Sequence, residues 1–165
     1  MNSLFNQDQI IYSLDTSSVI DAYHTWYPIG NFPTFWRCME ELIRGGRLKM
    51  SQFVYDEAMR DAAIKKWCHE NKLKSLFQSR IDRSEQLQVR DILLNFPKLL
   101  DTRRGKSGAD PWVIALAMRL QNSIVVTHEK PSGRKDRPKI PDVCLEYNIE
   151  CINIAGMIRN EEWTF

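Results

Sequence analysis

The stretch Ile10-Ile11-Tyr12-Ser13-Leu14-Asp15-Thr16-Ser17-Ser18 decides the fold class. Its first half is typical of a buried strand, because β-branched and aromatic side chains suit a packed, pleated surface. The polar second half supplies the kind of residues that precede a helix. A strand that turns directly into a helix is typical of parallel α/β sheets. It leaves Asp15 at the carboxyl end of the strand, beside free backbone N–H groups.

The same alternation of short apolar strands and helices continues along the chain. Further strands are expected at residues 48–50, 124–127 and 150–154, and the very apolar 124–127 is typical of the centre of a parallel sheet. Helices are expected at residues 35–43, over much of 63–100, and at 109–121, 143–147 and 155–160. Another helix is expected to begin directly after Ser51, which would cap it. This order predicts one domain over residues 1–165. We expect a three-layer α/β/α sandwich with a mostly parallel central sheet of about four to five strands.

Two apolar sets within residues 63–100 are expected to be buried. The first set comprises Trp67, Leu73, Leu76 and Phe77, and the second comprises Leu87, Ile92, Leu93, Phe96, Leu99 and Leu100. Pro97 is expected to end or kink the second helix, because proline cannot continue the hydrogen-bond ladder.

Composition restricts the class of protein. A chain of 165 residues with 43% hydrophobic and 27% charged residues suits a globular domain with a real core. The four cysteines form no closely spaced pair, which argues against structural zinc and favours reduced thiols. The first residues lack a secretory signal, and no apolar run approaches the ~18 residues of a membrane span. We therefore expect a cytoplasmic protein without a membrane partner.

Four acidic residues occupy the positions where such a fold gathers functional groups. Asp15 and Glu129 follow apolar strands, Glu57 lies in the helix after the second strand, and Asp110 begins the helix 109–121. Because the carboxyl ends of parallel strands meet at one edge of the sheet, these side chains are expected to converge. Clustered carboxylates suit hard cations, so the pattern predicts a Mg²⁺ or Mn²⁺ site. Such a metal site makes a phosphodiesterase the leading hypothesis.

Each acid also has a purely structural interpretation. Asp15 could serve only as a helix cap, and Asp110 only as a partner of the helix dipole. Glu57 could be a solvated helix residue, and Glu129 a loop charge. Their joint placement after apolar strands or at helix starts favours the metal site.

Four segments carry a resemblance to a known family: Leu14-Asp15-Thr16-Ser17, Val54-Tyr55-Asp56-Glu57, Gly108-Ala109-Asp110-Pro111-Trp112-Val113-Ile114-Ala115 and Val125-Val126-Thr127-His128-Glu129. In this order, over residues 10–154, they resemble the four signature blocks of the PIN domain. PIN domains are α/β/α nucleases, many of them ribonuclease toxins of bacterial toxin–antitoxin pairs. The chain is most similar to a PIN-like group in which the fourth block reads Thr-x-Glu. In that group a basic loop and the segment Ile140-Pro141-Asp142-Val143-Cys144 follow.

The resemblance implies a role for each matching residue. Asp15, Glu57 and Asp110 would be the core metal ligands, and Thr127 would orient a ligand or water. Glu129 would be the fourth acid, where the family more often has Asp. Because Glu is longer, it could coordinate through water or hold only a second metal.

Three further acids are weighed against this set. Asp142 is a rival for the fourth acidic place. Asp56 is the neighbour of Glu57 and points about 100° away on a helix, and the order of the family blocks favours Glu57. Asp21 is interpreted as a surface residue.

Basic residues flank the proposed acidic centre on both sides. Phosphate contacts supply most non-specific affinity for nucleic acids, so RNA is the expected partner, although solvated loops would have the same composition. Tyr23, Trp26, Tyr27 and Trp112 could stack on bases, although Trp112 also suits a core. The substrate-binding candidates are Arg104, Lys106, Lys130, Arg134 and Lys135, with Arg103, Arg137 and Lys139 nearby.

The leading hypothesis is a metal-dependent endoribonuclease, the toxin of a toxin–antitoxin pair. A protein antitoxin and a homodimer are implied by the resemblance alone. The alternative is a PIN-like module that binds RNA or a partner without cutting. A haloacid-dehalogenase-like phosphatase would need a second Asp where Ser17 stands, and no Gly-rich loop after the first strand supports a Rossmann enzyme.

Overall fold

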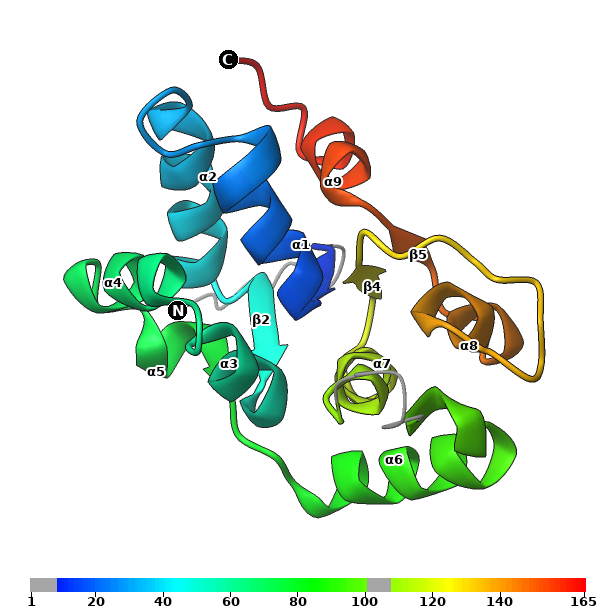
Figure 1. Ribbon diagram of the computed structural model, residues 1–165. Helices are drawn as coiled ribbons and strands as arrows, with labels where there is room; N and C mark the ends of the chain where they lie inside the picture. Colours follow the sequence, from blue (N-terminus) through cyan, green and yellow to red (C-terminus); the bar gives the residue numbers. More distant parts are fainter. Residues whose placement is uncertain (1–8, 101–107) are drawn as a thin grey trace.

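A five-stranded parallel sheet forms the centre of the molecule in the computed structural model, which describes residues 9–100 and 108–165 (Figure 1). The spatial order of the strands is β3-β2-β1-β4-β5, and every neighbouring pair is parallel. The strands are β1 (Ile11–Leu14), β2 (Leu48–Ser51), β3 (Gln78–Ser79), β4 (Ser123–Val126) and β5 (Cys151–Ile152). The predicted α/β/α class and the number of strands are confirmed.

Strand β1 is the point at which the winding of the sheet reverses. It pairs with β2 on one side and with β4 on the other, so Tyr12 lies between Leu48 and Ile124. At the carboxyl end Leu14 pairs with Val126, and the Asp15 N–H donates to the Val126 carbonyl at 2.9 Å. Ligands of open α/β sheets bind in the crevice at such a reversal. The carboxyl ends of β1 and β4 are therefore the first place to look for a site.

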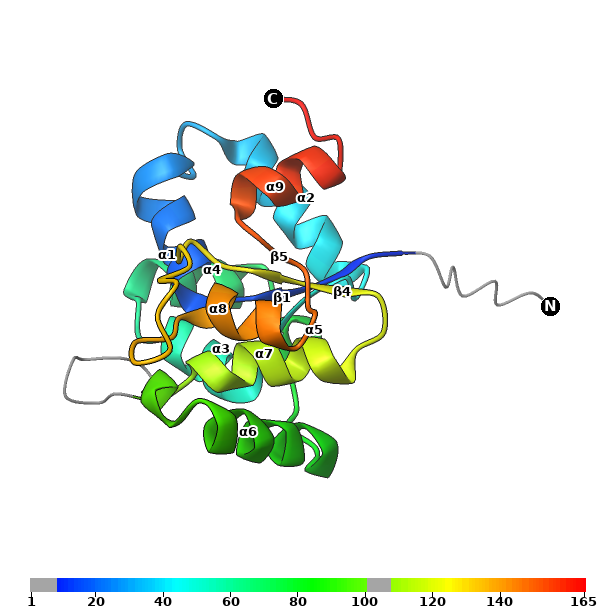
Figure 2. The same cartoon turned by 90° about the vertical axis from the view of Figure 1, so that its right-hand side faces the viewer.

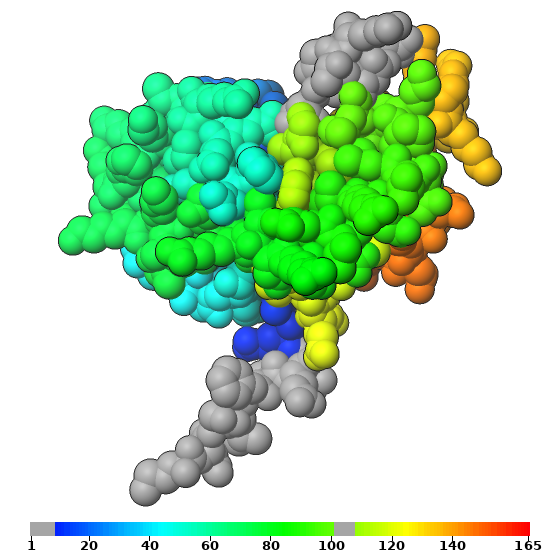
Figure 3. Space-filling model, turned by 90° about the horizontal axis from the view of Figure 1, so that it is seen from below, coloured from blue at the N-terminus to red at the C-terminus, as the bar shows by residue number. Residues whose placement is uncertain are grey.

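Helices cover both faces of the sheet. Figure 2 shows α2 and α9 above the strands and α7 below them, with α6 further out. In Figure 3, α6 spreads over the lower face and leaves a strip of α7 visible. The helices are α1 (Thr16–Asp21), the π-helical turn η1 (Ala22–Trp26), α2 (Pro33–Arg44), α3 (Gln52–Ala58), α4 (Ala62–Glu70), α5 (Lys74–Phe77), α6 (Arg83–Asn95), the 3-10 turn η2 (Pro97–Leu100), α7 (Asp110–Arg119), α8 (Ile140–Glu146) and α9 (Ile154–Asn160).

The segment 63–100 differs most from the prediction. Trp67, Leu73 and Phe77 are buried as expected, but Leu76 is 39% exposed and Leu87 is 54% exposed, so their predicted burial is wrong. The buried stripe of α6 follows Glu85, Val89 and Ile92, and Leu87 points to another side of the helix. The two-residue strand β3 was not predicted, because it is too short to produce an alternating pattern.

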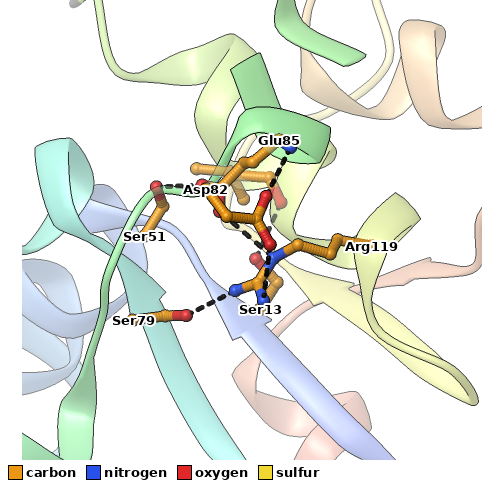
Figure 4. Close-up of polar contacts among 7 residues, drawn as sticks. Ser13, Ser51, Ser79, Asp82, Glu85 and Arg119 are labelled. Atoms are coloured by element: carbon orange, nitrogen blue, oxygen red, sulfur yellow. Dashed lines mark hydrogen bonds and ion pairs between the residues drawn. The ribbon is translucent and has the colours of Figure 1, made fainter. Parts of the chain in front are cut away.

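A buried polar network joins α6 and α7 to the sheet (Figure 4). The fully buried carboxylate of Glu85 accepts a hydrogen bond from the Ser51 hydroxyl. This hydroxyl makes no capping hydrogen bond to α3, so the predicted role of Ser51 as a helix cap is wrong. The Nε atom of Arg119 in α7 lies 3.3 Å from Oε2 of Glu85, and the two groups form an ion pair without a hydrogen bond between these atoms. Another guanidinium nitrogen of Arg119 donates to the Ser79 hydroxyl at 2.6 Å. Burial raises the pKa of Glu85, while Ser51 and Arg119 oppose that shift. The network fixes α6 and α7 against β2 and β3.

Across residues 9–100 and 108–165, every helix is too short or too polar to pass through a lipid bilayer.

Candidate functional site

Asp15 lies at the reversal point, in the position that precedes α1. Its side chain makes no capping hydrogen bond to the helix, so the interpretation as a simple helix cap does not account for it. Instead Oδ2 accepts hydrogen bonds from the hydroxyls of Thr127 at 2.8 Å and Ser17 at 2.5 Å. The residue is only 6% exposed. Two hydroxyls thus hold one oxygen of a buried carboxylate in place.

The environment of Asp15 disfavours its charge. Burial raises the pKa of Asp15 from 3.8 to about 6, although the hydroxyls of Ser17 and Thr127 oppose the shift. The nearby charges of Glu129 and Glu57 raise it further. Like charges gathered around a buried acid are costly unless a cation joins them. Perturbed acids of this kind are more frequent at functional sites than elsewhere.

Glu57 reaches the same edge through α3. Its Oε2 accepts a hydrogen bond from Thr16 at 2.8 Å, which places it beside the residue that follows Asp15. The side chain is half-buried, whereas its neighbour Asp56 is exposed and accepts from Gln78 at 3.3 Å. Of the two adjacent acids, Glu57 is therefore the one that faces the candidate site.

Asp110 is the first residue of α7 and is 8% exposed. The Ser13 hydroxyl donates to the Val113 carbonyl at 2.7 Å, which fixes the first turns of α7 beside β1. Asp110 lies about 4.5 Å further toward the amino end of the helix, given the rise of an α-helix. Figure 2 shows this end of α7 on the same side of the molecule as α1 and α3. Asp110 thus belongs to the carboxyl-end edge where Asp15 lies.

The segment after β4 supplies the remaining predicted residues. The Thr127 hydroxyl accepts a hydrogen bond from the Glu129 N–H at 3.1 Å while it donates to Asp15. Its donor and acceptor functions therefore connect the two acids. One oxygen of Glu129 accepts from the Ile140 N–H at 3.0 Å, which anchors this side chain to the start of α8.

Asp142 has a different role from the four acids. Its carboxylate accepts hydrogen bonds from the N–H groups of Ser132, Gly133 and Lys139 at 2.8–2.9 Å, and from the Ser132 hydroxyl at 2.8 Å. Partial burial opposes ionisation, but these N–H donors keep the pKa of Asp142 below its usual range. Asp142 therefore organises the loop between β4 and α8, and its capacity to accept bonds is largely used there.

The four acids share an edge without forming a closed ligand set. Within the described residues, no three His, Cys, Asp or Glu side chains stand close enough together to hold a metal ion as they are. The donor chemistry nevertheless suits Mg²⁺ or Mn²⁺, because all four groups offer carboxylate oxygens. The hydrogen bonds described above use Oδ2 of Asp15, Oε2 of Glu57 and Oε2 of Glu129. A cation at this edge would be held by Asp15 with the nearest of the other three acids, and by water.

The predicted substrate-binding residues are only partly described. Lys130, Arg134 and Lys135 are exposed on the loop between β4 and α8. Arg134 forms an ion pair with Asp136 at 2.7 Å, so part of its charge is already compensated. The proposed contacts of Arg104 and Lys106, together with Arg103, fall at residues 101–107, which lie outside the described residues.

A cleft of about 430 Å³ is lined by one of the four acids, Glu129, and by Thr127, the hydrogen-bond partner of Asp15. The carboxyl end of β5 and the start of α9 also line it. His128 also lines the cleft, and its Nδ1 lies 3.4 Å from Asp21 Oδ2.

Sequence reasoning missed the hydroxyls of Thr16 and Ser17 as partners of Glu57 and Asp15. The dense run of hydroxyl residues after Asp15 was interpreted only as capping signal. The pairing of His128 with Asp21 was missed as well, since no local pattern connects the two.

Comparison with known proteins gives a family without an assigned activity. No curated protein matches the chain. A family model described as a domain of unknown function, DUF4411, matches residues 12–165 and so includes all four acids and the cleft. The chain therefore belongs to the DUF4411 family.

Proposed function

We propose that the protein is a metal-dependent endoribonuclease that hydrolyses phosphodiester bonds of RNA. The observation that carries this proposal is the buried Asp15, whose pKa is raised to about 6 by burial and by the neighbouring charges of Glu129 and Glu57. The similarity of the four acidic segments to the PIN blocks supports the same conclusion.

The residues of the chain would divide the work as follows. Asp15, Glu57, Asp110 and Glu129 would hold Mg²⁺ or Mn²⁺, and Thr127 would keep Asp15 oriented through its 2.8 Å hydrogen bond. The metal would lower the pKa of a bound water and offset the charge of the phosphate. Lys130 and Lys135 would contact phosphates along the strand, because exposed cations are the usual partners of the RNA backbone.

The test is cleavage of a mixed RNA pool by the purified protein in EDTA, Mg²⁺ or Mn²⁺. Asp15→Asn and Asp110→Asn should each abolish metal-dependent cutting while the fold remains intact. Glu57→Gln should do the same, with Asp56→Asn as its matched control, because the exposed Asp56 points away from the site. Full activity in Asp15→Asn or Asp110→Asn would refute the assignment of the site.

The biological context follows from the resemblance alone. As the toxin of a toxin–antitoxin pair, the protein would act in the cytoplasm, bind a protein antitoxin and form a homodimer. Induction of the wild-type gene alone should then slow growth, and induction of the Asp15→Asn version should not. Equal growth with both versions would argue against a toxin.

Two observations favour a second candidate, a module that binds RNA or a partner protein without cutting. No three acids in the described part of the chain are close enough to form a ready metal site, and one oxygen of Glu129 is bound to the Ile140 N–H. Calorimetric titration of Mg²⁺ or Mn²⁺ separates the candidates. A nuclease should bind the metal and lose that binding in Asp15→Asn, whereas a non-cutting module should show no such difference.

A further inference from the structure

The cleft beside the acids has the size and position of a ligand site. Its volume of about 430 Å³ falls within the ~300–1,000 Å³ range of small-molecule pockets. Thr127 and Glu129 belong both to the cleft and to the acidic edge. A group bound in the cleft could therefore belong to the same molecule as a phosphate held near Asp15.

The walls of the cleft combine an aromatic ring with apolar and polar groups. Trp26 lines it from the end of η1 and is 60% exposed, while Pro131 and Ile154 supply apolar surface. Lys130, which precedes Pro131 in the chain, also lines the cleft. A flat, partly apolar ligand that carries a negative charge would suit these walls.

Trp26 differs from the other tryptophans. Trp36, Trp67, Trp112 and Trp163 each pack against another aromatic ring. Over residues 9–100 and 108–165, no ring contact of Trp26 is found. Its neighbour Tyr27 is fixed by stacking on Phe35 with ring centroids 4.5 Å apart, and by accepting a hydrogen bond from Trp36 through its carbonyl. The backbone next to Trp26 is thus fixed, and its exposed indole is available at the cleft for stacking on a ligand.

Asn153 offers a directed polar group in the same cleft. Its Oδ1 accepts the Gly156 N–H at 2.9 Å as the cap of α9, which fixes the orientation of the amide. Asn153 is exposed and lines the cleft, so its NH₂ group can serve as a hydrogen-bond donor there. A base edge with acceptor oxygens or nitrogens would satisfy this donor.

We infer that the cleft binds one unpaired nucleobase of a single-stranded RNA, stacked on Trp26 and hydrogen-bonded by Asn153, next to the phosphate at the acidic edge. This inference rests on the proposed function and adds to it a requirement for an unpaired base. Aromatic stacking tolerates every base, whereas a base held in a duplex cannot enter the cleft.

The test measures binding without cleavage. Fluorescence anisotropy in EDTA and low salt would follow labelled single-stranded oligoribonucleotides of uridine, cytidine or adenosine, about eight nucleotides long, and a labelled blunt-ended RNA duplex without unpaired bases. Trp26→Ala should weaken binding of the single strands by about tenfold and leave binding of the duplex unchanged. Trp26→Phe should restore most of the affinity, since it retains a ring.

The matched control is Leu94→Ala, which removes an exposed apolar side chain of α6, on the lower layer of the molecule. It should bind single strands like the wild type. Because Trp26 is largely exposed, its removal should leave the fold intact, and circular dichroism checks this. If wild type and Trp26→Ala bind single strands equally well, the base site is refuted while the nuclease proposal stands. If the wild-type protein neither binds nor cuts any RNA, the proposed function itself fails, and the base site fails with it.

Discussion

Replacement of Asp15 by asparagine should make the metal-free protein more stable while it abolishes activity. The side chain is 6% exposed, and burial together with neighbouring charges raises its pKa from 3.8 to about 6. The difference of roughly two pH units corresponds to ~3 kcal/mol, since one unit is worth about 1.4 kcal/mol. At pH 8 the folded protein carries this cost as a buried carboxylate. Asparagine has almost the same shape and no charge, so Asp15→Asn should remove up to that amount.

The gain should depend on pH in a defined direction. Because the pKa of Asp15 is higher in the folded than in the unfolded chain, the folded state of the wild type binds the additional proton between pH 4 and pH 6. The wild type should therefore lose stability relative to Asp15→Asn as the pH rises through this window. Above about pH 7 the difference should become constant, and near pH 4 it should be small.

Urea unfolding in EDTA at several pH values from 4 to 8 measures this difference. Asp56→Asn is the matched control, because the same chemical change at an exposed acid should follow the wild type. Added Mg²⁺ or Mn²⁺ should stabilise the wild type and leave Asp15→Asn unchanged, since only the former would bind the cation. The reasoning is refuted if Asp15→Asn is less stable than the wild type at pH 8, or if the difference does not change with pH.

Three further variants test other parts of the structure. Arg119→Met should lower the free energy of unfolding by about 3–5 kcal/mol, because it leaves the carboxylate of Glu85 buried without its cation, and urea unfolding checks this. Asp142→Ala should abolish the protection of the Ser132 and Gly133 amides in hydrogen exchange, whereas the exposed Asp136→Ala should preserve it. Thr127→Val should reduce cleavage by about ten- to hundredfold in a kinetic assay, since it removes a hydrogen bond to a charged group, and Thr127→Ser should retain activity.

The central part of the fold was predictable because its sequence signals are local. The apolar run before Asp15 and the one before Thr127 became β1 and β4, with boundaries within one residue of the prediction. Parallel pairing then placed both carboxyl ends at one edge, as the strand–helix alternation implied. The orientation of Glu57 toward this edge also agrees with its preference over Asp56.

The parts that failed depend on contacts distant in the sequence. Leu87 was expected to be buried, but α6 contacts the rest of the protein through the side that carries Glu85, a charged residue that no apolar pattern reveals. Ser51 has the composition of a cap, yet its hydroxyl is used by that same carboxylate, 34 residues later. Whether the four acids close on a cation is equally non-local, because it depends on how Asp15, Glu57, Asp110 and Glu129 adjust together. That part of the site stays a prediction.

The hydrogen bond between Thr127 and Asp15 joins residues 112 positions apart, and this separation has a consequence for synthesis. A nascent chain that has emerged only as far as α7 contains Asp15, Glu57 and Asp110 but lacks β4. Strand β1 would then have an unpaired edge, and the Asp15 carboxylate would lack the hydroxyl that orients it. Parallel pairing over such a distance is slow to form. The centre would thus stay incomplete on the ribosome until β4 has emerged, so under the proposed function a shorter nascent chain would be unable to cut RNA.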